Sequence, residues 1–250
     1  MGWAGIVDGL SATKDKADPA KARSGGAQSA KPLSHNLNGQ RLGRKGRDTR
    51  ERILAATNEL LEEGDQQISL SAVARKASLG MTSLYLYFND LTELLVAALE
   101  PVMATAEDSY VSLMRSHWPD AELRTRAREF VGAYHAFWVR HSRLLHLRNN
   151  MADRRDERML ILRVRSAQPL MRLMVEQMDG DPDQTGTPVS SMATALMTGL
   201  ERVVTVTTDD ALETLLHARF SPSHAQYLLD AEARILELAI RDYRTLAKTG

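Results

Sequence analysis

The sequence of 250 residues contains no cysteine. Disulfide bonds, thiolate-ligated metal clusters and cysteine-based redox sensing are therefore excluded, as is usual for proteins of a reducing cytoplasm. Long hydrophobic runs are also missing, since no apolar segment approaches the roughly 18–20 residues that span a bilayer. The first residues lack a basic segment ahead of a long apolar one, which argues against a secretory signal. We therefore expect a cytoplasmic protein with no membrane partner.

Net charge is zero, but the two signs are unevenly distributed. Residues 1–50 hold ten basic and four acidic residues, a net charge of +6, and the remainder carries −6. A basic end on an acidic body indicates contact with a polyanion, although a solvated tail would have the same composition. Residues 1–43 are rich in Ala, Ser, Gly, Lys and Gln and show no periodicity, which predicts a disordered basic extension.

Helical periodicity begins after this extension. Asp48, with Glu51 three residues on, forms a capping-box pattern that predicts a helix start, and Gly64 is a natural stop. A short helix is expected over residues 69–77, followed by a tight turn over 78–80.

A second capping box, Asp90 with Glu93, predicts the start of a longer helix. Pro101 falls inside this helix and is expected to kink or break it, because proline removes one helical hydrogen bond. The segment 179–188, "DGDPDQTGTP", predicts a loop. Further helices are expected over residues 120–141, 143–151, 155–178, 188–207, 210–220 and 222–248.

The stretch "LGMTSLYLYF" (79–88) alternates like a half-buried strand. A lone strand between helices would leave its backbone groups unpaired, so we predict a helix instead. Leu84 and Phe88 then share the inner face, Tyr85 points away from it and Tyr87 lies at its edge. A helix, a short turn and a second helix over 69–88 form a helix-turn-helix pattern.

Hydroxyl-bearing side chains on the outer face suit phosphate oxygens, and the basic segment immediately upstream favours DNA contact. The alternative interpretation is that Tyr85 and Tyr87 merely cover the small core of a three-helix unit.

Residues 47–100 resemble the DNA-binding domain of the tetracycline-repressor (TetR) family of bacterial regulators. The matching segments are "TRERILAATNELLEEG", "ISLSAVARKASLGMTSLYLYF" and "NDLTELLVAAL". The resemblance implies an all-α fold with an N-terminal three-helix helix-turn-helix domain over 44–106 (motif 69–88). It also implies a C-terminal helical ligand-binding and dimerisation domain over 107–250.

By this resemblance, the DNA-binding side chains would be Arg44, Lys45, Arg47, Ser69, Met81, Thr82, Ser83, Tyr85 and Tyr87. Met81 and Thr82 would face bases, and the serines and tyrosines would contact phosphates. The outer face lacks Arg, Asn and Gln, so specificity is expected from methyl contacts and DNA shape.

Three positions depart from the family pattern. Ser78 stands where glycine is usual, Gly80 where serine is usual, and Leu91 where a phosphate-contacting lysine often occurs. We expect the basic residues just upstream to compensate, as an arm that follows a groove. These residues are Arg41, Arg44, Lys45 and Arg47.

Aromatic and methionine side chains at helical spacing predict an adaptable apolar pocket, although the same pattern also fits plain core. The candidates are Met103, Phe130, Tyr134, Phe137, Trp138, Met151, Met171 and Met174. Arg148, Asn149, Asn150 and Gln168 are possible polar contacts, and the arginine-rich run 140–165 is expected to be a solvated surface. The histidines at 135, 141 and 146 are spaced by six and five residues, which does not suit a helical metal site. No metal, cofactor or catalytic residue is predicted.

Two later helices carry apolar lines that predict a four-helix dimer interface by the family resemblance, although both lines would also fit the subunit's own core. The candidates are Met192, Leu196, Gly199, Val203, Leu228, Ile235 and Ala239. Gly199 within a helix indicates a close approach between helices.

The sequence therefore predicts a ligand-responsive, sequence-specific DNA-binding regulator and not an enzyme. We expect a repressor that binds a palindromic double-stranded operator as a homodimer and is released by a small apolar or aromatic effector. Two alternatives stay open: a helical dimer that has lost DNA binding, and an all-α small-molecule-binding enzyme. Against the enzyme, no nucleophile grouping, glycine-rich phosphate loop or metal spacing is found.

Overall fold

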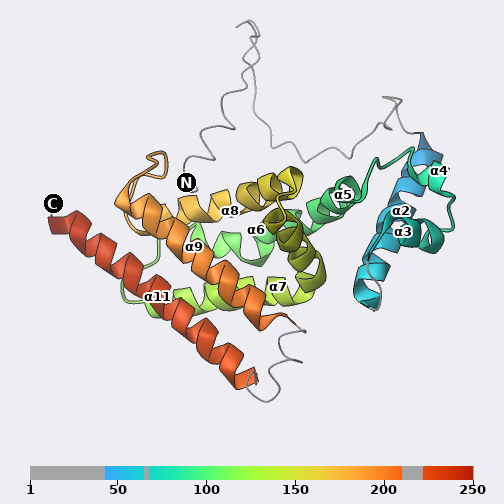
Figure 1. Cartoon of the computed structure of the whole chain (residues 1–250). Coiled ribbons are helices and arrows are strands. Elements are labelled where there is room, and N and C mark those ends of the chain that lie inside the picture. The colour runs from blue at the N-terminus through green and yellow to red at the C-terminus, as the bar shows by residue number, and fades with distance from the viewer. Residues whose placement is uncertain (1–42, 65–67, 210–221, 250) are drawn as a thin grey trace, which may run out of the picture.

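The computed structural model describes residues 43–64, 68–209 and 222–249, and every regular element within those ranges is a helix (Figure 1). The predicted all-α class is therefore confirmed for these residues. Residues 1–42 of the extension expected over 1–43, and the helix expected over 210–220, lie outside them. No helix in these ranges is both long and apolar enough to cross a membrane. The elements are α2 (Arg44–Glu63), α3 (Leu70–Lys76), α4 (Met81–Leu84), α5 (Leu91–Ala104), α6 (Ala106–Ser109), the 3-10 helix η1 (Val111–Met114), α7 (Leu123–Asp153), α8 (Glu157–Gln177), α9 (Pro188–Thr207) and α11 (Pro222–Thr249).

Two hydrophobic cores divide the molecule. The smaller core lies among α2, α3, α4 and the start of α5, and its fully buried members include Ile53, Leu84 and Phe88. The larger core is built by α5 to α11 and includes Trp118 and Trp138. Figure 1 shows α2, α3 and α4 gathered at one end, with α9 and α11 side by side at the other. Because α5 contributes to both cores, it connects them; the limits 44–106 and 107–250 stay predictions.

The start of α2 differs from the expectation. The helix begins at Arg44 with extended Gly43 before it, so the prediction of Asp48 as the N-cap was wrong. Arg47 N donates to Gly43 O at 3.1 Å, which closes the first turn upstream of Asp48. The same capping-box letters can occur inside a helix: three of the four helical residues before Asp48 are Arg or Lys, good helix formers, and the helix tolerates Gly46 among them.

Two further predicted helix starts, at Ser69 and Asp90, are confirmed. Ala72 N donates to Ser69 Oγ at 3.3 Å at the start of α3. Glu93 N donates to Asp90 Oδ1 at 2.8 Å at the start of α5. Both caps satisfy backbone N–H groups that the first helical turn leaves without partners.

A break or kink was expected at Pro101, and a boundary between two helices was expected near residue 142. Pro101 does not break α5, which runs on to Ala104. The helices expected over 120–141 and 143–151 form one helix, α7, which is interrupted at His141 by non-helical angles (φ −120°, ψ 19°). The expected boundary is thus a kink within a longer helix.

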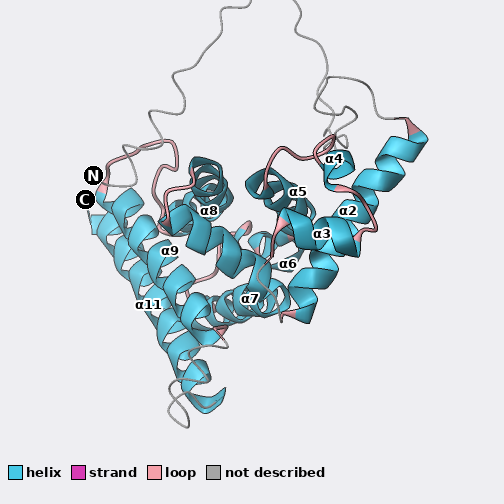
Figure 2. Ribbon diagram, turned by 45° about the vertical axis from the view of Figure 1, so that its right-hand side comes forward, coloured by secondary structure: helices cyan, strands magenta, loops and turns pink. Residues whose placement is uncertain are grey.

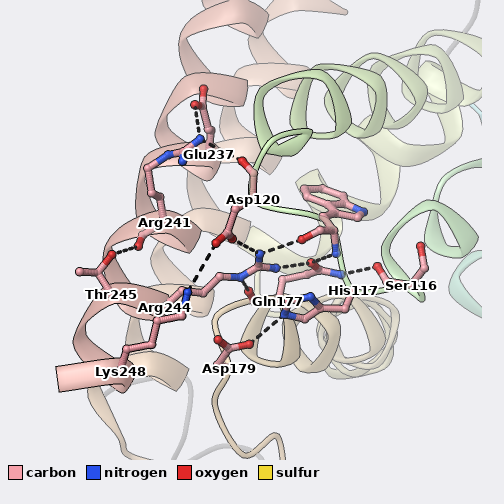
Figure 3. Close-up of polar contacts among 11 residues, drawn as sticks. Ser116, His117, Asp120, Gln177, Asp179, Glu237, Arg241, Arg244, Thr245 and Lys248 are labelled. Carbon is pink, nitrogen blue, oxygen red and sulfur yellow. Dashed lines mark hydrogen bonds and ion pairs between the residues drawn. The ribbon is translucent and has the colours of Figure 1, made fainter. Parts of the chain in front are cut away.

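A buried arginine fastens α11 to the rest of the body (Figure 3). Arg244 is 2% exposed and donates to the backbone oxygens of Gln177 and Trp118, each at 2.7 Å. It also pairs with Asp120 at 2.7 Å, and Gln177 Nε2 donates to Met114 O at 2.9 Å. The ends of α8 and α11 are therefore tied to the connection before α7, which fixes α11 along the outer edge in Figure 2.

Candidate DNA-binding face and ligand cleft

The turn between α3 and α4 has the geometry of a helix C-terminal cap. Ser78 N donates to Arg75 O at 3.1 Å and Leu79 N donates to Ala74 O at 2.8 Å, the two bonds of a Schellman motif. This motif needs a left-handed residue, and Ser78 supplies it with a φ of 53°. The glycine that the family resemblance places here would adopt that conformation without a Cβ penalty.

The short helix α4 presents one face inward and one outward. Leu84 is fully buried and Phe88 is 1% exposed, as predicted. Tyr85 is 49% exposed and Thr82 is exposed, so both lie on the outer face. The helix proper ends at Leu84, and Tyr87 N then donates to Leu84 O at 2.9 Å within a turn. The segment is helical and then turned, and it forms no strand.

The remaining predicted DNA contacts are partly covered. Met81, Ser83 and Tyr87 are half-buried on or beside α4. Ser69 is half-buried as the α3 N-cap, and its Oγ also lies 3.1 Å from Ser71 Oγ. A hydroxyl that accepts a capping bond can still donate to a phosphate oxygen.

The basic residues expected to form an arm are helical. Arg44, Lys45 and Arg47 occupy the first turn of α2 and are exposed. Two neighbouring cations are engaged within the unit: Arg50 lies over the Phe88 ring at 5.4 Å, and Lys76 pairs with Glu59 at 3.3 Å. The position of Arg41 lies outside the described residues.

Arg75, an exposed cation on the last turn of α3 within the helix-turn-helix pattern, was not among the predicted DNA contacts. Its position directly after the apolar residues of α3 could have indicated an exposed cation there. Leu91, which stands where the family often has lysine, is half-buried and packs against both cores. An apolar residue at the start of α5 thus contributes packing instead of charge.

Polar contacts join the helix-turn-helix unit, which comprises α2, α3, α4 and the start of α5, to the larger core. Arg143 of α7 donates from Nη1 to the carbonyl oxygens of Leu61 and Glu62, each at 2.8 Å. These oxygens lie at the C-terminus of α2, where a cation is favourable. A second contact joins α5 to the start of α8, where Thr92 Oγ1 donates to Asp156 Oδ2 at 2.8 Å.

The predicted aromatic pocket is nearly filled. Its cavity is about 10 Å³ and is lined by Met103, Tyr134, Phe137 and Trp138 among others. A space of this size holds about one water molecule. The ring centroids of Tyr110 and Tyr134 lie 4.9 Å apart in an edge-to-face arrangement, and burial raises the pKa of Tyr110 to about 12.

The other predicted pocket residues lie elsewhere. Phe130 and Met174 are buried in the larger core, and Met151 is half-buried against it. Met171 lines a separate and larger space, a cleft of about 210 Å³ between α9 and the pair α7–α8. The other lining residues of this cleft are Asn149, Asp153, Arg163, Ala167, Thr194, Met197, Thr198, Glu201, Arg202 and Thr205.

A buried ion pair separates the aromatic cavity from the cleft. Arg148 is 4% exposed and donates from Nη2 to Glu201 Oε1 at 2.9 Å. Asn149 Nδ2 donates to the same oxygen at 3.1 Å. The arginine-rich run was expected to be solvated, and for Arg148 that expectation was wrong. Its partner lies 53 residues away in α9, so no local pattern could have revealed the pair.

The predicted dimer residues divide between the inner and outer sides of α9 and α11. Leu196 is 4% exposed and belongs to the subunit's own core, whereas Ile235 is 52% exposed. Met192, Val203, Leu228 and Ala239 are half-buried. The outer face of α11 also exposes further large apolar side chains: Tyr227, Leu238 and Leu246.

Gly199 marks a close approach between helices, as predicted, but the approach lies within the subunit. A Cβ on Gly199 would lie 3.1 Å from Oε1 of Glu232 in α11. Glu232 is 7% exposed, makes no hydrogen bond or ion pair with another residue of the described ranges, and burial raises the pKa of its carboxyl group.

No family model and no curated protein matches this sequence. Among solved structures, it is similar to a TetR-like transcriptional regulator from Rhodococcus sp. RHA1, with 20% identity over 83% of this chain and 99% of that one and a TM-score of 0.49. It is also similar to a TetR family transcription regulator from Marinobacter aquaeolei VT8 (18% identity, 77% and 98% coverage, TM-score 0.49). A TetR-family regulator from Streptomyces coelicolor A3 matches with 19% identity, 79% and 98% coverage and a TM-score of 0.39. Likenesses of this degree establish neither family membership nor function.

Proposed function

We propose that this chain is a TetR-type regulator of transcription that binds a palindromic operator as a homodimer. The observation that carries the proposal is the geometry of α3, its left-handed turn and α4. Leu84 and Phe88 anchor α4 in the smaller core while Thr82 and Tyr85 remain on the outside. A short helix held in this way presents its outer side chains to a DNA groove.

Several groups around α4 suit the DNA backbone. Arg44, Lys45 and Arg47 form an exposed basic turn at the start of α2, and Arg75 adds a cation on α3. Tyr85 can donate its hydroxyl to a phosphate oxygen. Cations of this kind release counterions from DNA and supply affinity that does not depend on sequence. They compensate for Leu91, which contributes no charge.

Sequence preference would come from the apolar and methyl-bearing side chains of α4. Met81 and Thr82 can contact thymine methyl groups, while bidentate base readout needs side chains that α4 does not carry. The remaining preference would come from DNA shape.

Dimerisation would use the outer faces of α9 and α11. Ile235, Leu238 and Leu246 expose apolar side chains on α11, at the end of the molecule opposite α4 (Figure 1). Two copies joined there would present paired helix-turn-helix units to half-sites one helical turn apart.

Regulation would act through the body of the molecule in the cytoplasm. A small effector bound between α7, α8 and α9 would favour a spacing of the two DNA-binding units that does not fit the operator, and the chain would act as a repressor. The Pro101 region of α5, which connects the two cores, and Arg143 of α7 are the places where such a motion would pass. No enzymatic activity is proposed.

Genome-wide mapping of bound sites tests this proposal. We expect a small number of discrete sites that share an inverted repeat, one of them upstream of the protein's own gene. Uniform binding without a shared sequence, or no binding at all, would contradict a sequence-specific regulator.

A further inference from the structure

The cleft and the aromatic cavity share one wall. Both spaces are lined by Arg163, Ala167, Met197 and Glu201. The larger space, about 210 Å³, lies on the outer side, and the nearly filled aromatic cavity lies behind it. A molecule that enters the cleft therefore meets Glu201 before it meets Arg148.

Arg148 is held in place from several sides. Its Nε donates to Asn149 Oδ1 at 3.0 Å, its Nη1 lies 3.3 Å from Ser166 Oγ, and its guanidinium lies 5.7 Å from the Trp138 ring centroid. Its Nη2 and the Nδ2 of Asn149 converge on a single carboxylate oxygen of Glu201. Two donors aimed at one point form a ready cradle for a carboxylate, and a charged donor makes the stronger bond.

The two members of the ion pair differ in their freedom to move. The Arg148 side chain is 5% exposed, whereas the Glu201 side chain is 17% exposed and borders the cleft. A buried guanidinium that lost its anion would be costly, so Arg148 requires an acceptor at all times. Glu201 can turn into the cleft and become hydrated, provided that another anion takes its place.

Charge around the cleft favours an anion. The lining carries Arg163 and Arg202 against Asp153 and Glu201, and Arg148 behind the wall makes the balance positive. Arg202 is exposed and makes no hydrogen bond or ion pair with any residue the structure describes. An exposed, unpaired cation in the lining of a cleft attracts anions to it.

The rest of the cleft is suited to an apolar body. Ala167, Met171 and Met197 supply apolar surface, and methionine adapts its shape to flat rings. The volume suits a small molecule of one or two rings.

We propose that this cleft binds a small monocarboxylic acid with an apolar or aromatic body. The ligand carboxylate replaces the Glu201 carboxylate on Arg148 and Asn149, and the body lies against the methionines. The role of this acid as the effector rests on the proposed function above. A monocarboxylic acid differs from a purely apolar effector, because the buried Arg148 would bind its carboxylate.

Isothermal titration calorimetry with three matched probes tests the class of ligand. We expect 2-naphthoate to bind about tenfold more tightly than 2-naphthamide, the difference that one charge-assisted hydrogen bond supplies. The ammonium analogue, 2-naphthylmethylammonium, should bind more weakly than either. Equal affinities, a preference for the ammonium compound, or no binding of 2-naphthoate at millimolar concentration would overturn the proposal.

Two variants of the cleft locate the binding site. Glu201→Gln removes the competing carboxylate and should tighten 2-naphthoate binding about tenfold; weaker binding to a folded Glu201→Gln protein would overturn the proposal. Arg202→Gln alters an exposed side chain, preserves folding, and should weaken binding about threefold. The control Arg165→Gln, an exposed arginine of α8 outside the cleft, should change nothing. If Glu201→Gln fails to fold, which circular dichroism will show, Arg202→Gln decides: unchanged affinity would overturn the proposal.

These titrations contain no DNA, so their failure is distinct from a failure of the proposed function. Specific DNA binding without 2-naphthoate binding would overturn the ligand class alone. Binding of 2-naphthoate without specific DNA binding would overturn the proposed function and leave the site standing.

Discussion

Ser78 closes α3 with a φ of 53°, a left-handed conformation that costs a residue with a Cβ about 1–2 kcal/mol. The serine was visible in the sequence as a departure from a family pattern, but its conformation was not. The structure explains why glycine suits the position: the Schellman bonds at the end of α3 require this backbone geometry whatever the side chain.

Replacement of this serine by glycine should stabilise the protein. We expect Ser78→Gly to raise the free energy of unfolding by about 0.5–1 kcal/mol, since relief of strain is partly offset by the greater freedom of the unfolded chain. Gly186→Ala is the matched control, because Gly186 has a φ of 72° with open space around it and should lose about 1 kcal/mol. Urea denaturation measures both. A loss of stability in Ser78→Gly would contradict the assigned turn.

On the proposed DNA-binding face of α4, Tyr85 would contact the DNA backbone and Thr82 would contact bases. Tyr85→Phe should weaken binding about threefold to tenfold on every DNA sequence, because one hydroxyl contact to phosphate is lost. Thr82→Ala should instead change the preference between sites. Ser112→Ala, which removes an exposed hydroxyl from η1 in the larger core, is the control and should bind as the unaltered protein does. Wild-type affinity and preference in both α4 variants, measured by fluorescence anisotropy, would remove the basis for the assigned face.

Short sequence patterns predicted helix starts well, because a helix start depends on residues within a single turn. Asp90 was predicted to cap a helix and a helix was expected from Ser69, and both side chains do accept capping bonds. Asp48 carries the same signal, yet α2 starts at Arg44 because the preceding residues continue the helix. A capping-box pattern shows that a helix can start at that residue, but it does not exclude a start further upstream.

The contact between α9 and α11 predicts a dependence of stability on pH. Burial raises the pKa of Glu232 above its ordinary value of 4.5, so the folded state binds this proton more tightly than the unfolded state does. Stability is therefore lost as pH rises from about 4.5 through the raised pKa, and it stays lost above it.

Glu232→Gln should remove this loss. We expect the variant to be more stable than the unaltered protein at pH 7, with the difference shrinking to zero below about pH 4. The control Glu100→Gln, at an exposed position of α5, should show little difference at either pH. Thermal melts between pH 4 and pH 8 measure both variants. A Glu232→Gln protein that is less stable at pH 7 would indicate that the carboxylate has a cationic partner in the assembled protein.

Over the whole molecule, the periodicity of apolar residues predicted the all-α class and the inward orientation of Leu84 and Phe88. It did not predict the contacts between segments far apart in the sequence. Arg148 with Glu201, and Arg143 with the end of α2, each join residues more than fifty positions apart. The sequence also could not show that the aromatic pocket is nearly filled, because the packing of the side chains decides whether they leave a cavity between them.

Arg143 is the clearest link between the larger core and the helix-turn-helix unit. Arg143→Met removes both bonds to the end of α2, so the unit should hold its orientation less tightly and DNA affinity should fall about fivefold. Arg140→Met makes the same change of charge on the other side of the His141 kink, at an exposed position, and should leave affinity unchanged. Equal affinities of the two variants for the mapped operator would show that this link does not orient the unit.

The most direct test of the central claim is the affinity of the purified chain for its mapped operator, measured against salt concentration together with the number of chains bound. We predict two chains per inverted repeat and an affinity that falls steeply and linearly on logarithmic axes as salt rises. The operator should also bind at least about a thousandfold more tightly than unrelated DNA. Equal affinity for operator and unrelated DNA, or no salt-dependent binding, would contradict a sequence-specific DNA-binding dimer.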